Sequence, residues 1–281
     1  MIITRRSIVF ALVATMVAAA PCLAQSAAAS VARPLLTLDE MERFLLQAEI
    51  VETRRTQKGV TEARRVTLFD GRVKHDAQLQ DVDIALPMFN VGPKYSEVNF
   101  KDTYRYNIAG YRLSQLLGLD NVPMSVERKV NGKPAAMTWW LDDYMMDEGD
   151  RLKKKTVGPN PLRTANQLHV LRVFDELIQN RDRNAGNLLW TADWKMWMID
   201  HTRAFRLGKD LLKKQPLERV ERTLLEKMRE LTFPGLTDAM GKILTKDEIE
   251  AVLERRDTIV KLFDDRIASR GEATVLFTLE N

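Results

Sequence analysis

The side chains best suited to chemistry lie between positions 182 and 200. A polar loop that holds Asp182 and ends at Asn187 precedes two strand-like runs, and Asp200 directly follows the second run. A hairpin brings its two ends together, so Asn187 and Asp200 are expected to face each other. Their oxygens suit Mg²⁺ or Mn²⁺, and Asp182 is placed to accept a proton from an incoming hydroxyl. Phosphoryl transfer needs this division of roles, with cations on the phosphates and a carboxylate on the nucleophile.

The elements around this loop decide where those side chains lie. Apolar residues at helical spacing predict a helix leading into the loop and five others, over 166–179, 38–51, 101–119, 216–231, 236–243 and 246–269. Strand-like runs predict hairpins over 50–53, 65–69, 72–79, 122–130, 135–141, 188–190 and 195–199. Asp70-Gly71 and Asn131-Gly132 are the expected turns between strands.

These elements predict an α+β fold with two lobes. A β-rich N-terminal lobe is expected over 37–141, a charged link over 142–160 and a mainly helical C-terminal lobe over 161–281. Thr37 and Glu40 form a possible capping box at the first helix. The chain is 45% hydrophobic, which at this length is enough to bury a core of this kind.

The D-R-x-x-x-N loop at 182–187, with a strand hairpin that ends in Ile-Asp-His, resembles the catalytic core of several atypical kinases. These are the HipA-type kinases, the phosphoinositide 3-/4-kinases and the secretory-pathway kinases. The resemblance implies a two-lobed kinase-like fold, with Asp182 as the catalytic aspartate and the adjacent Arg183 as a second catalytic residue. It also implies that Asn187 and Asp200 hold the metal. The chain as a whole resembles a group of exported bacterial proteins.

Two positions depart from the kinase pattern. By the resemblance, Gln80 stands where active kinases have a phosphate-binding lysine, and Asn107 where they have its glutamate partner. A Gln–Asn amide pair can form without a lone buried charge, but it places no cation on the phosphates. Lys101, Arg105 and Lys74 are either candidates to supply that cation or solvated surface charges.

Other nucleotide contacts are expected near the link. Trp140 is a candidate to line the adenine site, as the lobe connection does in kinases; alternatively, one of Trp139 and Trp140 is a core residue and the other a surface residue. The turn at 57–61 has one glycine and makes a weak phosphate loop. His201 can orient Asp200 by a hydrogen bond, and the three scattered histidines do not predict a zinc site.

The N-terminus predicts export. Arg5 and Arg6 precede an uncharged apolar run over 7–20, and Ala24 precedes the expected cut, as in a secretory signal peptide. The paired arginines also match a twin-arginine signal loosely. Cys22 offers a lipidation site, although the preceding proline fits one poorly. We therefore expect a Sec or twin-arginine signal peptide over 1–24 and a mature protein in the periplasm or outside the cell.

The mature chain would begin with a flexible leader over 25–36. Cleavage after Ala24 removes two arginines and the only cysteine, and leaves 41 basic against 39 acidic residues. This near-neutral balance gives no argument for nucleic acid or an anionic membrane surface as a partner. No second apolar run predicts a transmembrane span in the mature chain.

Three functions fit these observations. The first is a phosphotransferase that uses Mg²⁺ or Mn²⁺ with ATP or another nucleotide, and acts on a protein, lipid or small-molecule acceptor. The second is a pseudokinase that binds a nucleotide or phosphorylated ligand and acts through partners. The third is an envelope scaffold without a ligand. Intact Asp182, Asn187 and Asp200 favour the first, whereas Gln80 and Asn107 favour the second.

Overall fold

The computed structural model describes residues 36–55, 63–90, 96–213 and 216–279. The predicted signal peptide, all but the last residue of the predicted leader and the turn at 57–61 lie outside the described residues. Everything described belongs to one compact unit, Leu35–Asn281.

The N-terminal part is an antiparallel five-stranded sheet with the order β1-β2-β3-β7-β6. Its strands are β1 (Glu49–Arg55), β2 (Arg64–Phe69), β3 (Lys74–Gln80), β6 (Ser125–Val130) and β7 (Lys133–Trp139). The predicted turns are confirmed, since Gly71, Asn131 and Gly132 all have the positive φ that such turns require. Helix α1 (Leu38–Gln47) covers the sheet and starts at the predicted capping box of Thr37 and Glu40.

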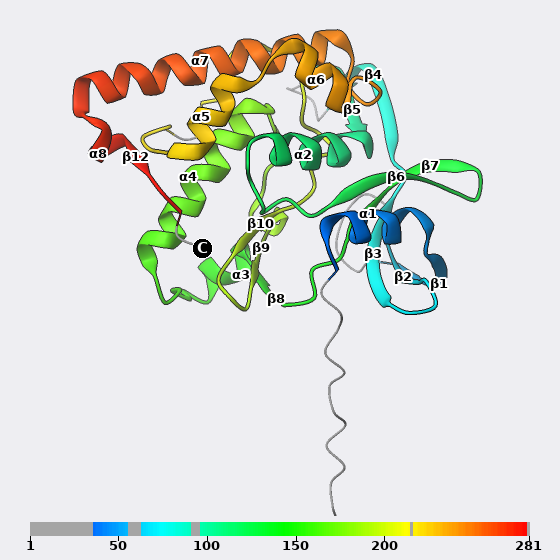
Figure 1. Cartoon of the computed structure of the whole chain (residues 1–281). Helices are drawn as coiled ribbons and strands as arrows, with labels where there is room; N and C mark the ends of the chain where they lie inside the picture. Colours follow the sequence, from blue (N-terminus) through cyan, green and yellow to red (C-terminus); the bar gives the residue numbers. More distant parts are fainter. Residues whose placement is uncertain (1–35, 56–62, 91–95, 214–215, 280–281) are drawn as a thin grey trace, which may run out of the picture. The chain divides into compact units, whose positions relative to one another are not determined.

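A second hairpin, β4 (Asp83–Asn90) with β5 (Ser96–Thr103), lies between β3 and α2 (Arg105–Leu116). The predicted helix over 101–119 was therefore wrong in its first residues, because 101–103 belong to a strand. Residues 101–103 form a strand because they pair with β4. The spacing of apolar residues within 101–119 does not reveal that pairing. Figure 1 shows the hairpin near α6, at the side of the C-terminal helices.

The predicted link contains two short elements. Strand β8 (Tyr144–Asp147) pairs with β9 (Leu188–Thr191), which in turn pairs with β10 (Met196–Met198). Helix α3 (Glu148–Lys153) follows β8, and Asp147 caps it. The link thus adds an edge strand to the predicted 188–199 hairpin.

The C-terminal part is mainly helical, as predicted. It holds α4 (Pro161–Leu177), the short helix η1 (Ala185–Asn187), α5 (Arg222–Glu230), α6 (Phe233–Met240), α7 (Lys246–Arg270) and α8 (Glu272–Val275), with a small parallel pair, β11 (Val220–Glu221) and β12 (Leu276–Phe277). Thr245 and Glu248 form a capping box at α7. Within the described ranges, no helix is long and apolar enough to cross a membrane.

Helix α2 connects the two parts (Figure 1). Its residues Ala109 and Leu113 belong to the core of the C-terminal helices, whereas Ile108 packs with Ala136 of the sheet. Arg112 donates to the Ala239 carbonyl of α6 over 2.7 Å, and Tyr106 donates to Glu248 of α7 over 2.6 Å. Helix α2 is therefore fixed on both sides.

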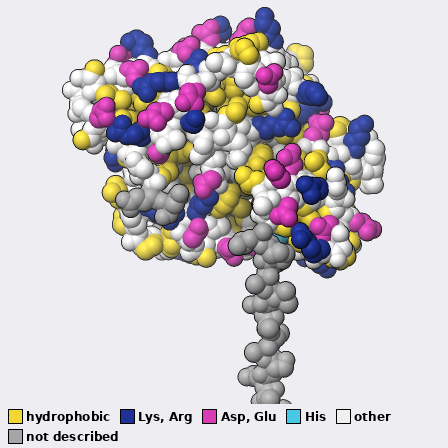
Figure 2. All heavy atoms as spheres, in the orientation of Figure 1, with side chains coloured by type: hydrophobic (Ala, Val, Ile, Leu, Met, Phe, Trp, Pro, Cys, Tyr) yellow, Lys and Arg dark blue, Asp and Glu magenta, His cyan; other side chains and the backbone are white. Residues whose placement is uncertain are grey.

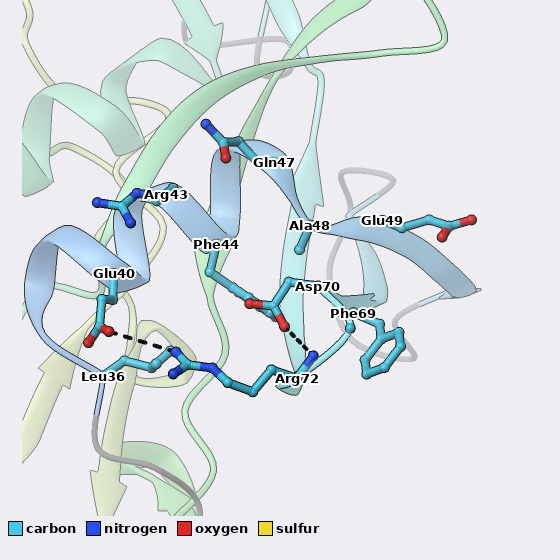
Figure 3. A pocket seen from close by; sticks show the side chains of 11 residues that line it. Leu36, Glu40, Arg43, Phe44, Gln47, Ala48, Glu49, Phe69, Asp70 and Arg72 are labelled. Carbon is cyan, nitrogen blue, oxygen red and sulfur yellow. Dashed lines mark hydrogen bonds and ion pairs between the residues drawn. The ribbon is translucent and has the colours of Figure 1, made fainter.

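The surface seen in Figure 2 carries acidic and basic side chains interspersed with one another. A hollow of about 540 Å³ lies between α1 and the β2–β3 turn, where Glu40 and Arg72 form an ion pair (Figure 3). Its lining contains none of the predicted site residues. The contacts of the predicted residues, and not this hollow, therefore define the candidate site.

Candidate functional site

The predicted hairpin is confirmed as β9 and β10, and its two ends meet next to Asn187, at the mouth of the hairpin. Leu188 pairs with Met198, and the Ile199 amide donates to the Asn187 carbonyl over 3.1 Å. This backbone pairing confirms that Asn187 lies opposite the residue before Asp200. Asp200 itself has φ 57°, in the left-handed region, where side chains other than glycine are uncommon. The backbone thus turns sharply at Asp200.

Arg183 holds this mouth together. Its guanidinium forms a mostly buried ion pair with Asp175 of α4, with Nε 3.0 Å from Oδ2 and Nη2 3.0 Å from Oδ1. Nη1 donates to the carbonyls of Asn187, over 3.2 Å, and Ile199. The structure therefore shows Arg183, predicted as catalytic, bound to the helix and to both ends of the hairpin. These contacts position the loop.

Asp182 lies at the open side of the loop and is about half exposed. Its amide donates to Asn180 Oδ1 over 3.1 Å. Its carboxylate Oδ1 lies 3.4 Å from Nη1 of Arg203. An exposed carboxylate that is steered by a neighbouring cation is accessible to an incoming hydroxyl.

The segment after Asp200 is docked on the β4–β5 hairpin. Glu97, which is buried, forms ion pairs with Arg203, over 2.8 Å, and with Arg206. The guanidinium of Arg203 lies 5.0 Å from the ring centre of Phe100. The Thr103 amide donates to the Thr202 carbonyl over 3.0 Å. This hairpin, absent from the predicted elements, therefore forms one wall of the site.

Asp102 is the site residue that sequence reasoning missed. Its carboxyl group has one buried oxygen, Oδ1, without a hydrogen-bond partner. Burial raises the pKa of Asp102; the Thr202 hydroxyl lowers it, and the nearby charges of Asp200 and Asp182 raise it further. The sequence signal was weak, because a single aspartate near a wrongly placed helix start resembles a capping residue.

The predicted Gln80–Asn107 amide pair is confirmed. Asn107 Nδ2 donates to Gln80 Oε1 over 2.7 Å, and both residues are buried. The side-chain oxygen Oδ1 of Asn107 accepts a hydrogen bond from the His201 backbone amide over 2.8 Å. A neutral chain of hydrogen bonds therefore runs from β3 through α2 to the residue after Asp200.

His201 lies in the core, apart from this carboxylate cluster. Its ring packs edge-on against Phe174 and lies so close to Gly110 that a Cβ added there would be 3.1 Å from the ring. Burial, with the nearby charge of Arg183, lowers the pKa of His201 well below its usual value. His201 is thus a neutral core residue, and its backbone amide is the part that contacts the site.

The candidate cations are engaged elsewhere. The ammonium of Lys101 forms an ion pair with the buried Glu248 of α7. Arg105 lies 3.8 Å from Asp83. Lys74 and Gln80 are six residues apart on one strand, which is about 20 Å at the usual strand rise. None of the three therefore takes the place of the missing lysine in this structure.

Trp140 lies beside the sheet, at the end of β7. The guanidinium of Arg65 stacks over its ring at 4.4 Å, and Asp76 pairs with the same guanidinium. Trp139 instead packs on the core side, against His75 and Phe44. Both tryptophans are thus partly buried, with Trp139 packed against the core and Trp140 against Arg65. Trp140 remains the candidate to meet a nucleotide base.

The oxygen donors at the hairpin mouth fit a hard divalent cation. Among the described residues, no three His, Cys, Asp or Glu side chains converge on one point as a preformed metal site. A site here would instead combine the amide of Asn187 with the carboxylate of Asp200, and both are oxygen ligands of the kind that Mg²⁺ and Mn²⁺ take. The unpartnered oxygen of Asp102 beside Asp200 agrees with a missing cation.

Comparison with known proteins gives the fold. The sequence matches no family model and no curated protein. Its structure is similar to that of a Golgi casein kinase, with a TM-score of 0.59 and 15% identity, over 86% of this chain and 78% of that one. It is also similar to the Helicobacter pylori proinflammatory kinase CtkA, with a TM-score of 0.50 and 10% identity, over 82% and 98%. The chain therefore has the α+β fold of atypical kinases, with a β-rich N-terminal part and a helical C-terminal part.

Proposed function

We propose that this protein is an exported, kinase-like phosphotransferase that works with a nucleotide and a divalent cation. The observation that carries the proposal is a kinase-like fold in which the loop holds Asp182 and the hairpin is flanked by Asn187 and Asp200. Arg183 bonds the carbonyls of Asn187 and Ile199 and so positions both ends of the hairpin. A scaffold without a ligand would not need these three side chains in the loop and at the hairpin ends.

Each residue has a separate role in this proposal. Asp182 orients the acceptor hydroxyl and takes its proton, and Arg203 keeps its carboxylate in place. Asn187 and Asp200 would hold the cation, which would offset the charge of the transferred phosphate. Trp140 would meet the base of the nucleotide. Arg183 acts only by positioning the loop.

The test is transfer of labelled phosphate by the mature protein. Wild type is incubated with γ-labelled ATP and Mn²⁺ or Mg²⁺, and ADP and labelled products are followed with protein, lipid and small-molecule acceptors. Asp182→Asn should abolish transfer, since it removes the base while keeping the shape. Asp120→Asn is the matched control, because Asp120 is exposed and pairs with Lys195 on the surface. Equal transfer by wild type and Asp182→Asn would contradict the assignment.

A nucleotide-binding pseudokinase is the second candidate. The Gln80–Asn107 pair is complete without a ligand, and the candidate lysines contact other partners. In that case nucleotide binds, yet no label is transferred and Asp182→Asn changes neither result. Binding without transfer would therefore favour this candidate over the enzyme.

Export belongs to the proposal as well. It rests on the basic, apolar and small-residue order of residues 1–24. Expression of the full chain in a bacterial host should give a shortened protein in the periplasm or medium, with Gln25 as its N-terminal residue. An intact N-terminus on protein recovered from the cytoplasm would contradict export.

A further inference from the structure

Asp102 has an unusual environment for a carboxylate. It lies one residue before the end of β5, and its Oδ1 is buried without a hydrogen-bond partner. Buried polar atoms are normally paired, and leaving one unpaired costs about 1–3 kcal/mol. The Thr202 hydroxyl contacts the Asp102 carboxyl group, and Oδ1 is left with its acceptor capacity unused. Oδ1 is therefore available to bind a ligand.

The position of Asp102 is fixed relative to Asp200. The Thr103 amide donates to the Thr202 carbonyl over 3.0 Å, which ties the end of β5 to the segment after Asp200. The Thr202 hydroxyl donates to Asp200 Oδ1 over 3.0 Å and also lies against Asp102. One hydroxyl has one proton to donate. It cannot satisfy two carboxylates together, so the pair is left short of a positive partner.

The charges around Asp102 agree with this view. Asp182 and Asp200 are both close enough to raise the pKa of Asp102, and Arg203 is the cation that opposes them. Arg203 is itself shared with Glu97 and Asp182. The neighbouring Lys101 contacts Glu248. The three carboxylates and the one guanidinium that they share leave net negative charge here, which a cation bound by Asp200 and Asp102 would offset.

We propose that Asp102 is a further ligand, direct or through a water molecule, of the divalent cation held by Asn187 and Asp200. This inference rests on the proposed function and deepens it. Where a Lys–Glu pair would bring one positive charge to the phosphates, Gln80 and Asn107 bring none. A third oxygen ligand lets the site hold a divalent cation more tightly, so the metal carries the charge that the lysine does not.

The experiment measures Mn²⁺ binding alone, by the electron paramagnetic resonance signal of the free ion. The mature protein is compared with Asp102→Asn, which keeps the size of the side chain and removes its charge. Wild type should bind Mn²⁺, and Asp102→Asn should bind it at least tenfold more weakly. Asp200→Asn should abolish binding. Asp83→Asn is the matched control, because Asp83 is an exposed carboxylate on the same hairpin.

A second readout separates a lost ligand from a damaged fold. Without metal, Asp102→Asn should melt at the same temperature as wild type or higher, since it removes a partly buried charge close to the carboxylates of Asp182 and Asp200. Mn²⁺ should raise the melting temperature of wild type more than that of the variant. If Asp102→Asn does not fold, Asp102→Glu replaces it, because the longer side chain keeps the charge but moves the carboxylate.

The outcomes distinguish the inference from the proposed function. Wild-type affinity in both Asp102 variants, with binding lost in Asp200→Asn, would overturn the role of Asp102 and leave the cation site standing. No Mn²⁺ binding by wild type, with or without ATP, would contradict the proposed function itself. Equal weakening by Asp83→Asn would show that Asp102 acts only through general charge, and would also overturn the inference.

Discussion

The buried amide pair and the acidic hairpin mouth lie on either side of one residue, His201, and they differ in completeness. The side-chain Nδ2 of Asn107 donates to Gln80, and its Oδ1 accepts from the His201 backbone amide. Both ends of the Asn107 side chain are therefore hydrogen-bonded within the protein. Asp200, on the other side of His201, has a left-handed backbone and shares one hydroxyl with Asp102. The hydrogen bonds of the amide pair are all made within the protein. The carboxylates of Asp200 and Asp102 instead share one donor and can accept a further ligand.

The difference separates a structural role from a chemical one. In kinases with a Lys–Glu pair, the same side chains join the sheet to the helix and contact the phosphates. Here the amide pair keeps only the joining role, and α2 is further fixed by Tyr106 and Arg112. Charge is concentrated at the hairpin mouth instead. We therefore expect variants of the two regions to fail in different ways.

The largest effect is expected at Arg183, on which the acidic mouth depends. Arg183→Met leaves the mostly buried carboxylate of Asp175 without its cation and frees the carbonyls of Asn187 and Ile199. The free energy of unfolding should fall by about 3–5 kcal/mol, measured by urea denaturation. Lys261→Met removes an exposed helix pair and should cost at most about 0.5 kcal/mol. Similar losses in both variants would contradict the positioning role of Arg183.

The next effect is expected at the amide pair. Gln80→Leu leaves the buried Asn107 amide without its acceptor and should cost about 1–3 kcal/mol of unfolding free energy. Gln80→Lys should cost more, because it buries an unpaired charge, and Asn107→Glu added to it should restore part of the loss. Urea denaturation of the three variants checks this order. A Gln80→Lys variant as stable as wild type would show that the position is open to water.

A smaller effect is expected from pH, on the difference in melting temperature between wild type and Asp102→Asn. Burial raises the pKa of Asp102 above 3.8, so its charge disfavours the folded state at neutral pH. This cost is full above the raised pKa and disappears as the pH falls towards 3.8. Without metal, the melting temperature of Asp102→Asn should therefore exceed that of wild type at pH 7, and the difference should shrink on acidification. A constant difference would contradict the view that ionisation of Asp102 destabilises the folded state.

The smallest effect is expected at Trp140. Removing a cation–π contact near the surface costs about 0.5–1 kcal/mol, and Trp140→Ala loses the one with Arg65. Trp197→Ala is the matched control, since Lys195 lies 4.4 Å over that ring. Both variants should lose similar stability in urea denaturation, but only Trp140→Ala should bind nucleotide more weakly in calorimetry. Equal nucleotide affinities would remove Trp140 from the site.

Local signals predicted much of the fold. The Asp70-Gly71 and Asn131-Gly132 turns located two hairpins of the sheet, and helical spacing with capping residues located the C-terminal helices. The β4–β5 hairpin was missed. Pro87 interrupts β4, and Asn99 in β5 has a left-handed backbone, so neither run has the regular pattern of a strand. Such strands are held by pairing with each other.

The candidate site also combines residues that a local motif indicates with residues that only the packing of separate segments brings together. The loop motif predicted Asp182, Asn187 and Asp200, because all three lie within one short stretch of sequence. The partner of Arg183 is Asp175 on the preceding helix, a contact that depends on how α4 meets the hairpin. Asp102 reaches the site only because Glu97 and Thr103 dock the β4–β5 hairpin on the residues after Asp200. Contacts between distant segments leave no periodic signal in the sequence.

We infer that the mouth of the β9–β10 hairpin is a metal-dependent nucleotide site that works without a Lys–Glu pair. The most direct test is a thermal titration of the mature protein with ATP, ADP and AMP, with and without Mn²⁺ or Mg²⁺, beside Asp200→Ala. Ligand at a hundredfold its dissociation constant should stabilise wild type by about 2.7 kcal/mol. We expect a shift in melting temperature that needs both nucleotide and metal and that Asp200→Ala abolishes. No shift in wild type, or the same shift in the variant, would contradict it.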